Sequence, residues 1–281
     1  MSRDRVIVSL STIPPRFGKL RPVLHSLLNQ SHPADEIRLY IPKIYKRFGA
    51  YNLDQLTIPE GVTVKIVETD MGPATKILPC IRDHRGQDVV LVYCDDDRLY
   101  ARTWLAALVQ ELQQRPNHAI TASGADLSRT YQIECDTQMQ QPRAIRKRVK
   151  YDRNYLGQRM MQFARRTLGI HAPKPHRYLY ESGGYVDFAM GVGGVALRPS
   201  DMPEIAFNIP DVAWPVDDIW LSGCLAINGV RIWASDKALM PTPADSSEIE
   251  ALVDATFDGL GRHESDRTCI AYLRATYGIW S

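Results

Sequence analysis

The stretch "DVVLVYCDDDRLY", residues 88–100, joins a short apolar run to three consecutive aspartates. An unbroken apolar run such as Val89–Tyr93 is typical of a strand that is buried on both faces. Asp95, Asp96 and Asp97 follow this run almost at once. Carboxylates so close together repel one another, and each resists ionisation beside the others. The cluster therefore predicts a positively charged partner at the end of this strand.

The surrounding sequence alternates between strand-like and helix-like segments. The pattern predicts an α/β fold with a mostly parallel sheet and helices on both faces. Ligands of such sheets bind beyond the carboxyl ends of the strands, where the aspartates stand, so the cluster points to a site. Strands are expected at 5–12, 36–42, 62–69, 88–94, 118–124 and, as the last one, 231–235, and helices at 19–31, 73–84, 102–116 and from about 217 to 230.

The composition is that of a globular protein. The 281 residues are 44% hydrophobic and 23% charged, and the net charge of +2 predicts no nucleic-acid partner. The N-terminal residues do not resemble a signal peptide, and no apolar run approaches the roughly 18 residues that cross a bilayer. Five widely spaced cysteines, of which Cys80, Cys94 and Cys224 have apolar neighbours, predict buried thiols and a cytoplasmic location.

Three carboxylates at a strand end suit a hard divalent cation. Mn²⁺ and Mg²⁺ take oxygen ligands, and Mg²⁺ commonly combines one or two carboxylates with substrate phosphates. An acidic turn or a helix cap is the competing interpretation, because aspartate is favoured before a helix. After a buried strand in an alternating α/β chain, the metal interpretation is favoured.

Together with the Asp-x-Asp motif, three further stretches resemble a GT-A fold glycosyltransferase of the inverting, family 2-like kind. They are "VSLSTIPPRFGKLRPVLHSLLNQS" (8–31), "GGVALRPS" (193–200) and "VDDIW" (216–220). The resemblance covers roughly residues 5–240. It implies one GT-A domain at 1–281, with a Rossmann-like, nucleotide-sugar-binding half at 1–125 and an acceptor-binding, catalytic half at 126–281.

The resemblance implies roles for the residues around the first and fourth strands. Asp97 would be the direct metal ligand, and Asp95 would contact the sugar nucleotide through its ribose or through the metal. Asp96 would bind the donor sugar. Thr12 and Arg16 lie just after the first strand, where the family holds the nucleotide, although Arg16 also suits a solvated loop.

Other candidate ligands follow from the same resemblance. Asp70 would bind the base or the ribose, and Lys76, at a helix start, a phosphate or a base carbonyl. Gly193 and Gly194 would form a wall of the nucleotide-sugar site, where backbone can approach a ligand closely. His263 would be a further metal ligand on a mobile loop, although a surface histidine is the plain alternative.

Inverting transfer needs a carboxylate that takes the proton from the acceptor hydroxyl. The family pattern assigns this base to the second acidic residue of "VDDIW", which is Asp218, with Asp217 beside it. The family more often has Glu-Asp here. The competing interpretation is a helix cap, for which a single aspartate would suffice.

The basic segment 143–166 contains apolar residues among its arginines. It predicts contact with an anionic, lipid-linked acceptor or with the inner face of the membrane, and a solvated basic face is the alternative. Taken together, we expect metal-dependent transfer from a UDP-sugar to a glycan or lipid-linked acceptor, with a part in polysaccharide biosynthesis. A retaining transferase or a non-catalytic sugar-nucleotide-binding domain remains the alternative.

Two other classes of enzyme fit the motifs poorly. A haloacid dehalogenase-type hydrolase would carry Asp-x-Asp on its first strand, whereas here it follows the fourth. A nucleotidyltransferase would need a glycine-rich basic loop after the first strand, and "STIPPRFG" (11–18) is not one.

Overall fold

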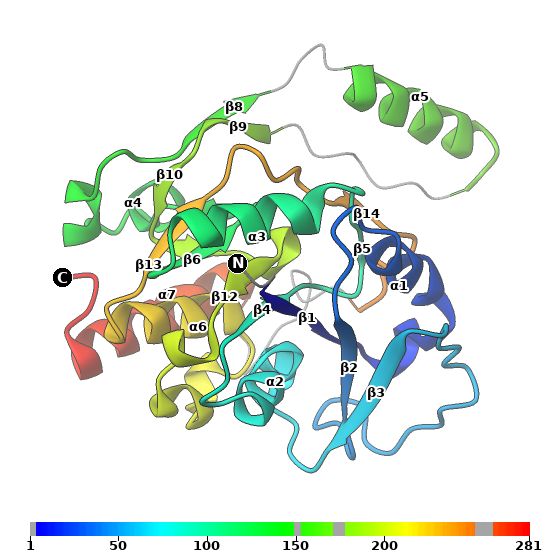
Figure 1. The fold of residues 1–281 in the computed structure, drawn as a ribbon, viewed down its shortest axis with the longest axis horizontal. Helices are drawn as coiled ribbons and strands as arrows, with labels where there is room; N and C mark the ends of the chain where they lie inside the picture. Colours follow the sequence, from blue (N-terminus) through cyan, green and yellow to red (C-terminus); the bar gives the residue numbers. More distant parts are fainter. Residues whose placement is uncertain (1–3, 149–152, 171–177, 251–260) are drawn as a thin grey trace.

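The structure is a computed structural model that describes residues 4–148, 153–170, 178–250 and 261–281. Its centre is an eight-stranded sheet with the order β10-β13-β6-β12-β4-β1-β2-β3 (Figure 1). The strands are β1 (Arg5–Ser11), β2 (Glu36–Pro42), β3 (Val62–Val67), β4 (Val89–Tyr93), β5 (Arg98–Leu99), β6 (His118–Thr121), β7 (Gly124–Ala125), β8 (Ile145–Arg148), β9 (Tyr178–Ser182), β10 (Gly184–Val186), β11 (Phe188–Ala189), β12 (Val195–Leu197), β13 (Arg231–Ala234) and β14 (Thr242–Pro243).

Helices pack around this sheet, and short 3₁₀ turns shape its loops. The α-helices are α1 (Arg21–Leu28), α2 (Leu78–Asp83), α3 (Trp104–Gln114), α4 (Leu127–Tyr131), α5 (Arg153–Thr167), α6 (Asp217–Ile227) and α7 (Arg262–Tyr277). The 3₁₀ turns are η1 (Pro14–Lys19), η2 (Gly72–Lys76), η3 (Asp136–Met139), η4 (Gly191–Gly193), η5 (Pro199–Asp201), η6 (Glu204–Phe207) and η7 (Asp211–Ala213).

The sheet is mostly parallel, as the strand–helix alternation predicts. β1 pairs in parallel with both β2 and β4, β2 pairs in parallel with β3, and β13 pairs in parallel with β6. β12 runs antiparallel between β4 and β6, and β10 is antiparallel to β13. The carboxyl ends of β1, β3 and β4 therefore meet at one edge of the sheet.

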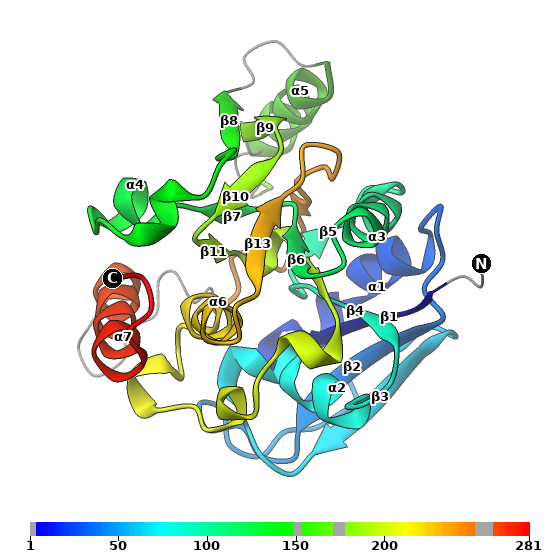
Figure 2. The same cartoon turned by 60° about the vertical axis from the view of Figure 1, so that its left-hand side comes forward.

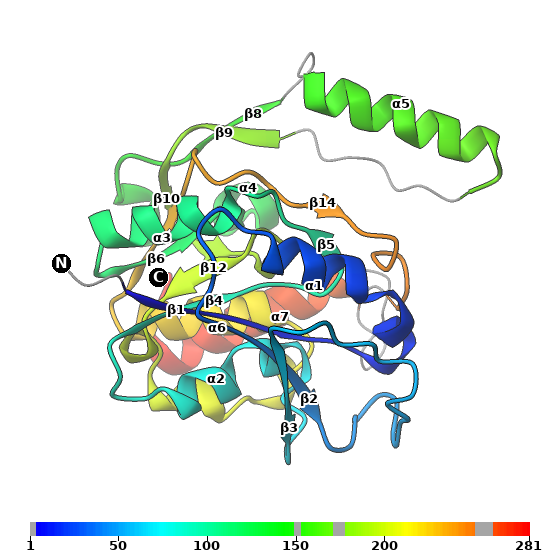
Figure 3. The same ribbon diagram turned by 45° about the vertical axis from the view of Figure 1, so that its right-hand side comes forward.

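The two faces of β1 contribute to two hydrophobic cores. Val6, Val8 and Leu10 pack in the core with α1 and α3, while Ile7 packs in the core with α2, α6 and α7. Side chains of a strand alternate between faces, so a continuous apolar run serves both layers. Figure 3 shows α1 and α3 on one side of the sheet and α2, α6 and α7 on the other.

Several local predictions need correction. The segment around His263 is the first turn of the 16-residue helix α7, which begins after Gly261, and is not a mobile loop. A further short strand, β14, follows the strand at 231–234 that was expected to be the last. The basic segment 143–166 spans β8, which pairs antiparallel with β9, and most of the helix α5, which lies at the edge of the molecule (Figure 2). None of the described helices is at once long enough and apolar enough to cross a bilayer.

Gly194 joins η4 to β12 where another residue would not fit. Its backbone has φ +78° and ψ 151°, a region that is essentially restricted to glycine. A Cβ there would overlap the ring of the fully buried Trp104. The indole of Trp104 in turn donates a hydrogen bond to the carbonyl oxygen of Gly193 at 2.7 Å.

Replacing Gly194 by alanine should destabilise the fold strongly. Backbone strain and overlap with Trp104 act together, so we expect a loss of about 3 kcal/mol or more in the free energy of unfolding. Gly86→Ala is the matched control, because Gly86 has φ +79° and nothing lies within 4 Å of the position that a Cβ would take. It should lose about 1 kcal/mol. Equal losses in urea unfolding would contradict the role given to the contact with Trp104.

Candidate functional site

A cavity of about 460 Å³ lies at the carboxyl edge of the sheet. Its walls come from the loops after β1, β2, β3 and β4, from η4, from the start of α6 and from the start of α7. This volume is within the range of sites for small molecules and cofactors. Of the twelve residues predicted for the site, nine line the cavity: Thr12, Arg16, Asp70, Lys76, Asp95, Asp96, Asp97, Asp217 and Asp218.

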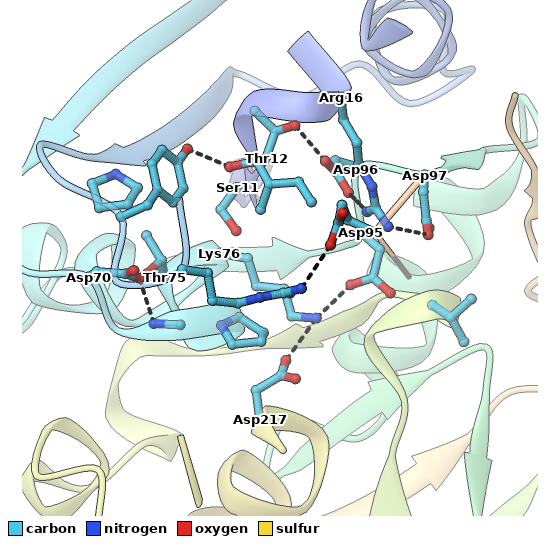
Figure 4. A pocket seen from close by; sticks show the side chains of 18 of the residues that line it. Ser11, Thr12, Arg16, Asp70, Thr75, Lys76, Asp95, Asp96, Asp97 and Asp217 are labelled. Atoms are coloured by element: carbon cyan, nitrogen blue, oxygen red, sulfur yellow. Dashed lines mark hydrogen bonds and ion pairs between the residues drawn. The ribbon is translucent and has the colours of Figure 1, made fainter. Parts of the chain in front are cut away.

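Thr12, Arg16 and Asp96 bind one another. The hydroxyl of Thr12 donates to Oδ2 of Asp96, and the guanidinium of Arg16 contacts Oδ1, each at 2.5 Å. Arg16 also lies 3.5 Å from Asp97 Oδ2 and donates from Nε to the carbonyl oxygen of Ile249. Both oxygens of Asp96 are thus engaged by the first loop. The middle aspartate locks the β1 loop onto the end of β4 (Figure 4).

Lys76 lies between the aspartates at the end of β4 and the Asp217–Asp218 pair at the start of α6. Its Nζ is 2.5 Å from Asp95 Oδ1 and 2.9 Å from Asp217 Oδ2 (Figure 4). Burial alone would lower the pKa of this lysine, but Asp217 and Asp95 raise it well above its usual value. In turn, burial would raise the pKa of Asp95, and Lys76 lowers it below the usual value instead. The lysine and Asp95 are therefore a charged pair.

A glycine makes room for this lysine. A Cβ at Gly191, in η4, would overlap Nζ of Lys76 and would lie 2.9 Å from Asp95 Oδ1. The amide of Gly191 donates to Asp218 Oδ1 at 2.8 Å. The backbone of Gly191 thus lies against Asp95, Asp218 and the Lys76 ammonium group between them.

Asp70 organises backbone rather than pointing freely into the cavity. Its Oδ2 accepts from the amide of Lys46 at 2.7 Å, and its Oδ1 accepts from the amide of Gly72 at 2.8 Å. Gly72 has φ +60° and sits against Trp214, where a Cβ would clash. The carboxylate therefore fixes the loops after β2 and β3 relative to each other. Its predicted contact with a base or ribose remains a prediction.

The carboxyl group of Asp97 has an unusual pKa for an acidic motif that looks like a surface turn. Burial, together with Asp95 and Asp96, raises the pKa of Asp97 to about 6, although Arg98 and Arg16 oppose the shift. Its Oδ1 is buried, makes no hydrogen bond to the described residues, and lies 3.2 Å from Nε of Arg98. The ionised form of this group is therefore only partly compensated by the protein.

The surroundings of Asp218 shift its pKa close to neutral pH. Burial and the neighbouring Asp217 raise the pKa of Asp218 to about 7, while Lys76 and Arg262 oppose the shift. Arg262 lies 4.0 Å from Asp218 Oδ2 and is held by the carbonyl oxygen of Pro215 and by Asp266. A carboxylate with a pKa near the working pH is suited to accept a proton.

Three predicted residues lie apart from the cavity lining. Gly193 and Gly194 pack against Ser123 and Trp104, so their missing side chains serve packing within the protein. His263 is exposed on α7, where its ring lies beside Tyr131 and its Nε2 is 3.3 Å from the carbonyl oxygen of Thr130. The structure does not bring this histidine to the aspartates.

The metal prediction fits this geometry in part. Among the described residues no group of three or more His, Cys, Asp or Glu is arranged to hold a metal ion. Asp97, with its partly compensated charge, and Asp95 offer oxygen atoms that suit one hard cation whose other ligands come from water or substrate. The residues present fit such a cation, but not the predicted ligand set that includes His263.

The loop after β14 belongs to the site, although no pattern in its own sequence predicted a functional role. Ser247 and Glu250 line the cavity, and the amide of Ala244 donates to the carbonyl oxygen of Asp97. Its partners lie about 150 residues earlier in the chain, so neighbouring residues carry no signal of the contact. Tyr45, Phe48 and Trp214 add an apolar wall to the cavity.

Solved structures that are similar to this chain include an S. aureus protein and a mannosyltransferase. No protein-family model and no curated protein matches the chain. S. aureus TarS (1–349) shares 13% identity with a TM-score of 0.43, over 88% of this chain and 61% of that one. The mannosyltransferase PcManGT from Pyrobaculum calidifontis, in complex with GDP-Man and Mn²⁺, shares 20% identity with a TM-score of 0.32, over 44% of this chain and 36% of that one.

This chain thus spans less than two thirds of the length of either structure. The TM-scores are low, so the similarity assigns neither a substrate nor the role of any residue. The chemistry of the site has to be argued from its own geometry.

Asp218→Asn should stabilise the protein at alkaline pH. The folded-state pKa of about 7 lies above the ordinary aspartate value of 3.8, so the folded state favours the protonated carboxyl. The contribution of this group to stability is present at acidic pH and is lost as the pH rises through about 7. Asparagine keeps the oxygen that faces Gly191 without the charge. We expect a gain of about 2 to 4 kcal/mol near pH 8 and little change near pH 4.

Urea unfolding at several pH values measures this difference. Asp211→Asn is the control, because Asp211 is an exposed aspartate on η7, and its effect should be small at every pH. A stability difference for Asp218→Asn that does not grow between acidic and alkaline pH would contradict the raised pKa.

Proposed function

We propose that this protein is a glycosyltransferase that transfers a sugar from a nucleotide-sugar to a glycan or lipid-linked acceptor with inversion. One observation carries the proposal: a single cavity holds the strand-end aspartates and the Asp217–Asp218 pair on either side of the buried Lys76. A donor needs cations and a metal at its diphosphate, and an acceptor needs a base. The cavity offers groups suited to each.

Asp218 is the proposed general base. Its pKa of about 7 leaves a large fraction of the carboxylate ionised at neutral pH and still basic enough to take a proton from an attacking hydroxyl. The amide of Gly191 fixes one oxygen, and Arg262 lies near the other. Asp217, paired with Lys76, positions the start of α6 and helps to raise the pKa of Asp218.

The donor side is proposed to lie at Asp95, Asp96 and Asp97. Asp97 and Asp95 would hold one Mn²⁺ or Mg²⁺, which would stabilise the charge that develops on the leaving diphosphate. Lys76 and Arg262 place positive charge in the same cavity. Arg16 and Thr12 hold Asp96 in place, so we propose that they support the donor pocket through this aspartate. Asp70 supports the loops of the pocket.

The nucleotide is proposed to be UDP, following the family resemblance, with the apolar wall of Tyr45, Phe48 and Trp214 available to the base. Roles for Gly193 and Gly194 in the donor site, and for His263 at the metal, stay predictions that the packing of these residues does not favour. A retaining transferase is the alternative, and the anomeric configuration of the product distinguishes it from the inverting enzyme.

Three broader proposals accompany this function. The chain would form one GT-A domain, with a donor half at 1–125 and an acceptor half at 126–281, acting in polysaccharide biosynthesis. A cytoplasmic location is supported by five free cysteines, all of them buried. The basic segment 143–166 would contact the inner face of the membrane, where a lipid-linked acceptor resides.

Nucleotide-sugar binding should depend on metal and on Asp97. With Mn²⁺ present, one nucleoside diphosphate or its sugar should raise the melting temperature by mass action, and chelator should remove the shift. Asp97→Ala should lose the metal-dependent shift, because the cation loses its main ligand. Asp211→Asn should retain it. A metal-dependent shift that survives in Asp97→Ala would contradict the assignment, and no shift with any nucleotide would favour a different phosphate ligand.

Asp218→Asn should bind the donor and fail to transfer sugar. Loss of a general base lowers the rate by about 10²- to 10⁴-fold, while the melting-temperature shift with the donor should persist. In the native enzyme, kcat/KM should fall about tenfold per pH unit below about 7, as Asp218 becomes protonated. Rates are measured as release of nucleoside diphosphate with a matching acceptor. Transfer by Asp218→Asn at the native rate would show that another residue is the base.

A further inference from the structure

The helix α5 stands apart from the rest of the fold. All three ribbon views show it at the periphery, beyond the antiparallel pair β8–β9 and away from the central sheet (Figures 1, 2 and 3). Tyr155 and Gln162 are its buried side chains among the residues whose burial is described. They lie seven positions apart, so they mark one inward-facing side of the helix.

The outward half of α5 is apolar. Phe163, Leu156 and Met160 recur at helical spacing on one side and are 71%, 45% and 75% exposed. Met161 (62% exposed) and Leu168 (75%), just past the end of the helix, extend this surface around the same half. A helix that buries its polar Gln162 and exposes two methionines and a phenylalanine is the reverse of an ordinary surface helix. We call the set Leu156, Met160, Met161, Phe163 and Leu168 the outer apolar face.

The segment that contains this face is basic, and some of its arginines lie on α5 itself. Between residues 143 and 170 the sequence has nine Arg or Lys and one acidic residue, Asp152. Arg165 and Arg166 are exposed on α5 beside the outer apolar face, and Arg159 is half-buried. Apolar side chains next to exposed arginines complement the acyl chains and the anionic headgroups of a lipid layer. A protein partner would have to match a convex apolar helix with an acidic rim, whereas a lipid surface adapts to it.

The position of α5 links this surface to the proposed site. Arg165 pairs with Asp245 at 3.2 Å, and Asp245 lies in the loop after β14. The same loop contributes Ser247 and Glu250 to the cavity, and its Ala244 amide contacts the carbonyl oxygen of Asp97. A surface held by α5 is therefore connected through one ion pair to the wall of the donor pocket.

We propose that the outer apolar face of α5 inserts into the headgroup region of an anionic phospholipid bilayer, with the exposed Arg166 on the headgroups. This specifies the membrane contact named in the proposed function and rests on that function only for its purpose, the presentation of a lipid-linked acceptor. The docking itself needs neither donor nor catalysis. Insertion is shallow, because the face spans one half of a helix.

Vesicle co-sedimentation of the full chain tests the proposal. The chain should bind phosphatidylglycerol–phosphatidylcholine vesicles, bind pure phosphatidylcholine at least tenfold more weakly, and lose affinity as salt is raised. The double variant Met160→Ser/Phe163→Ser should bind the anionic vesicles at least tenfold more weakly than the native chain. Ile44→Ser/Ile66→Ser is the matched control, since these two isoleucines, in the loop after β2 and on β3, are 63% and 51% exposed, and it should bind as the native chain does.

The outcomes separate docking from function. Native vesicle binding by Met160→Ser/Phe163→Ser, or equal binding to neutral and anionic vesicles, would overturn the proposal. The proposal would also be overturned if the native chain failed to bind vesicles and instead self-associated through this face. Light scattering would show such self-association as a difference in mass between the native chain and the double variant. Melting-temperature shifts with nucleotide should be unchanged in the double variant. Loss of the nucleotide shift in the native chain would refute the proposed function and leave the vesicle result standing.

Discussion

The buried ammonium group of Lys76 is the interaction on which the site depends. A lysine in the interior is costly unless it is paired, and here two carboxylates from distant parts of the chain pair with it. Asp95 comes from the end of β4 and Asp217 from the start of α6. The lysine therefore ties the strand edge to the helix that carries Asp218. Removing any one of the three would leave a buried charge without its full compensation.

The buried Lys76 also constrains the backbone around it. Gly191 must remain without a side chain for the lysine to fit, and its amide then holds Asp218. Asp218 itself is kept at a raised pKa by burial and by Asp217, which is unfavourable for stability at neutral pH. Groups held in such strained electrostatic environments are common at functional sites, where activity and stability place opposite demands on the same residue.

Most of the cavity lining could be predicted because parallel strands end at the same edge. Thr12, Asp70 and Asp97 each follow a strand, so position relative to a strand end was sufficient to group them. What the sequence does not contain is the pairing among them. That Arg16 contacts Asp96, 80 residues later, depends on the packing of two loops.

The predictions that the structure corrects, or that the packing does not favour, have equally specific causes. A glycine-rich pattern does not say whether the close approach is to a ligand or to the protein, and at Gly194 the neighbour is Trp104. The polar residues after Gly261 look like a loop, yet Cys269, Ile270 and Leu273 give that segment a buried face and a helix forms. His263 is thereby directed to Tyr131, a residue more than 130 positions away.

The antiparallel strand β12 has a consequence for how this chain is made. β4 and β6 are successive strands of the central sheet along the chain, yet in the sheet β12 lies between them, and it is synthesised about 70 residues after β6. At about 5 to 20 residues per second, the ribosome needs roughly 4 to 15 s to supply it. During that interval β4 and β6 both lack β12, β6 also lacks its other neighbour β13, and both strands carry apolar side chains. A nascent chain of this topology is exposed to mispairing and to chaperone capture until Val195–Leu197 arrives.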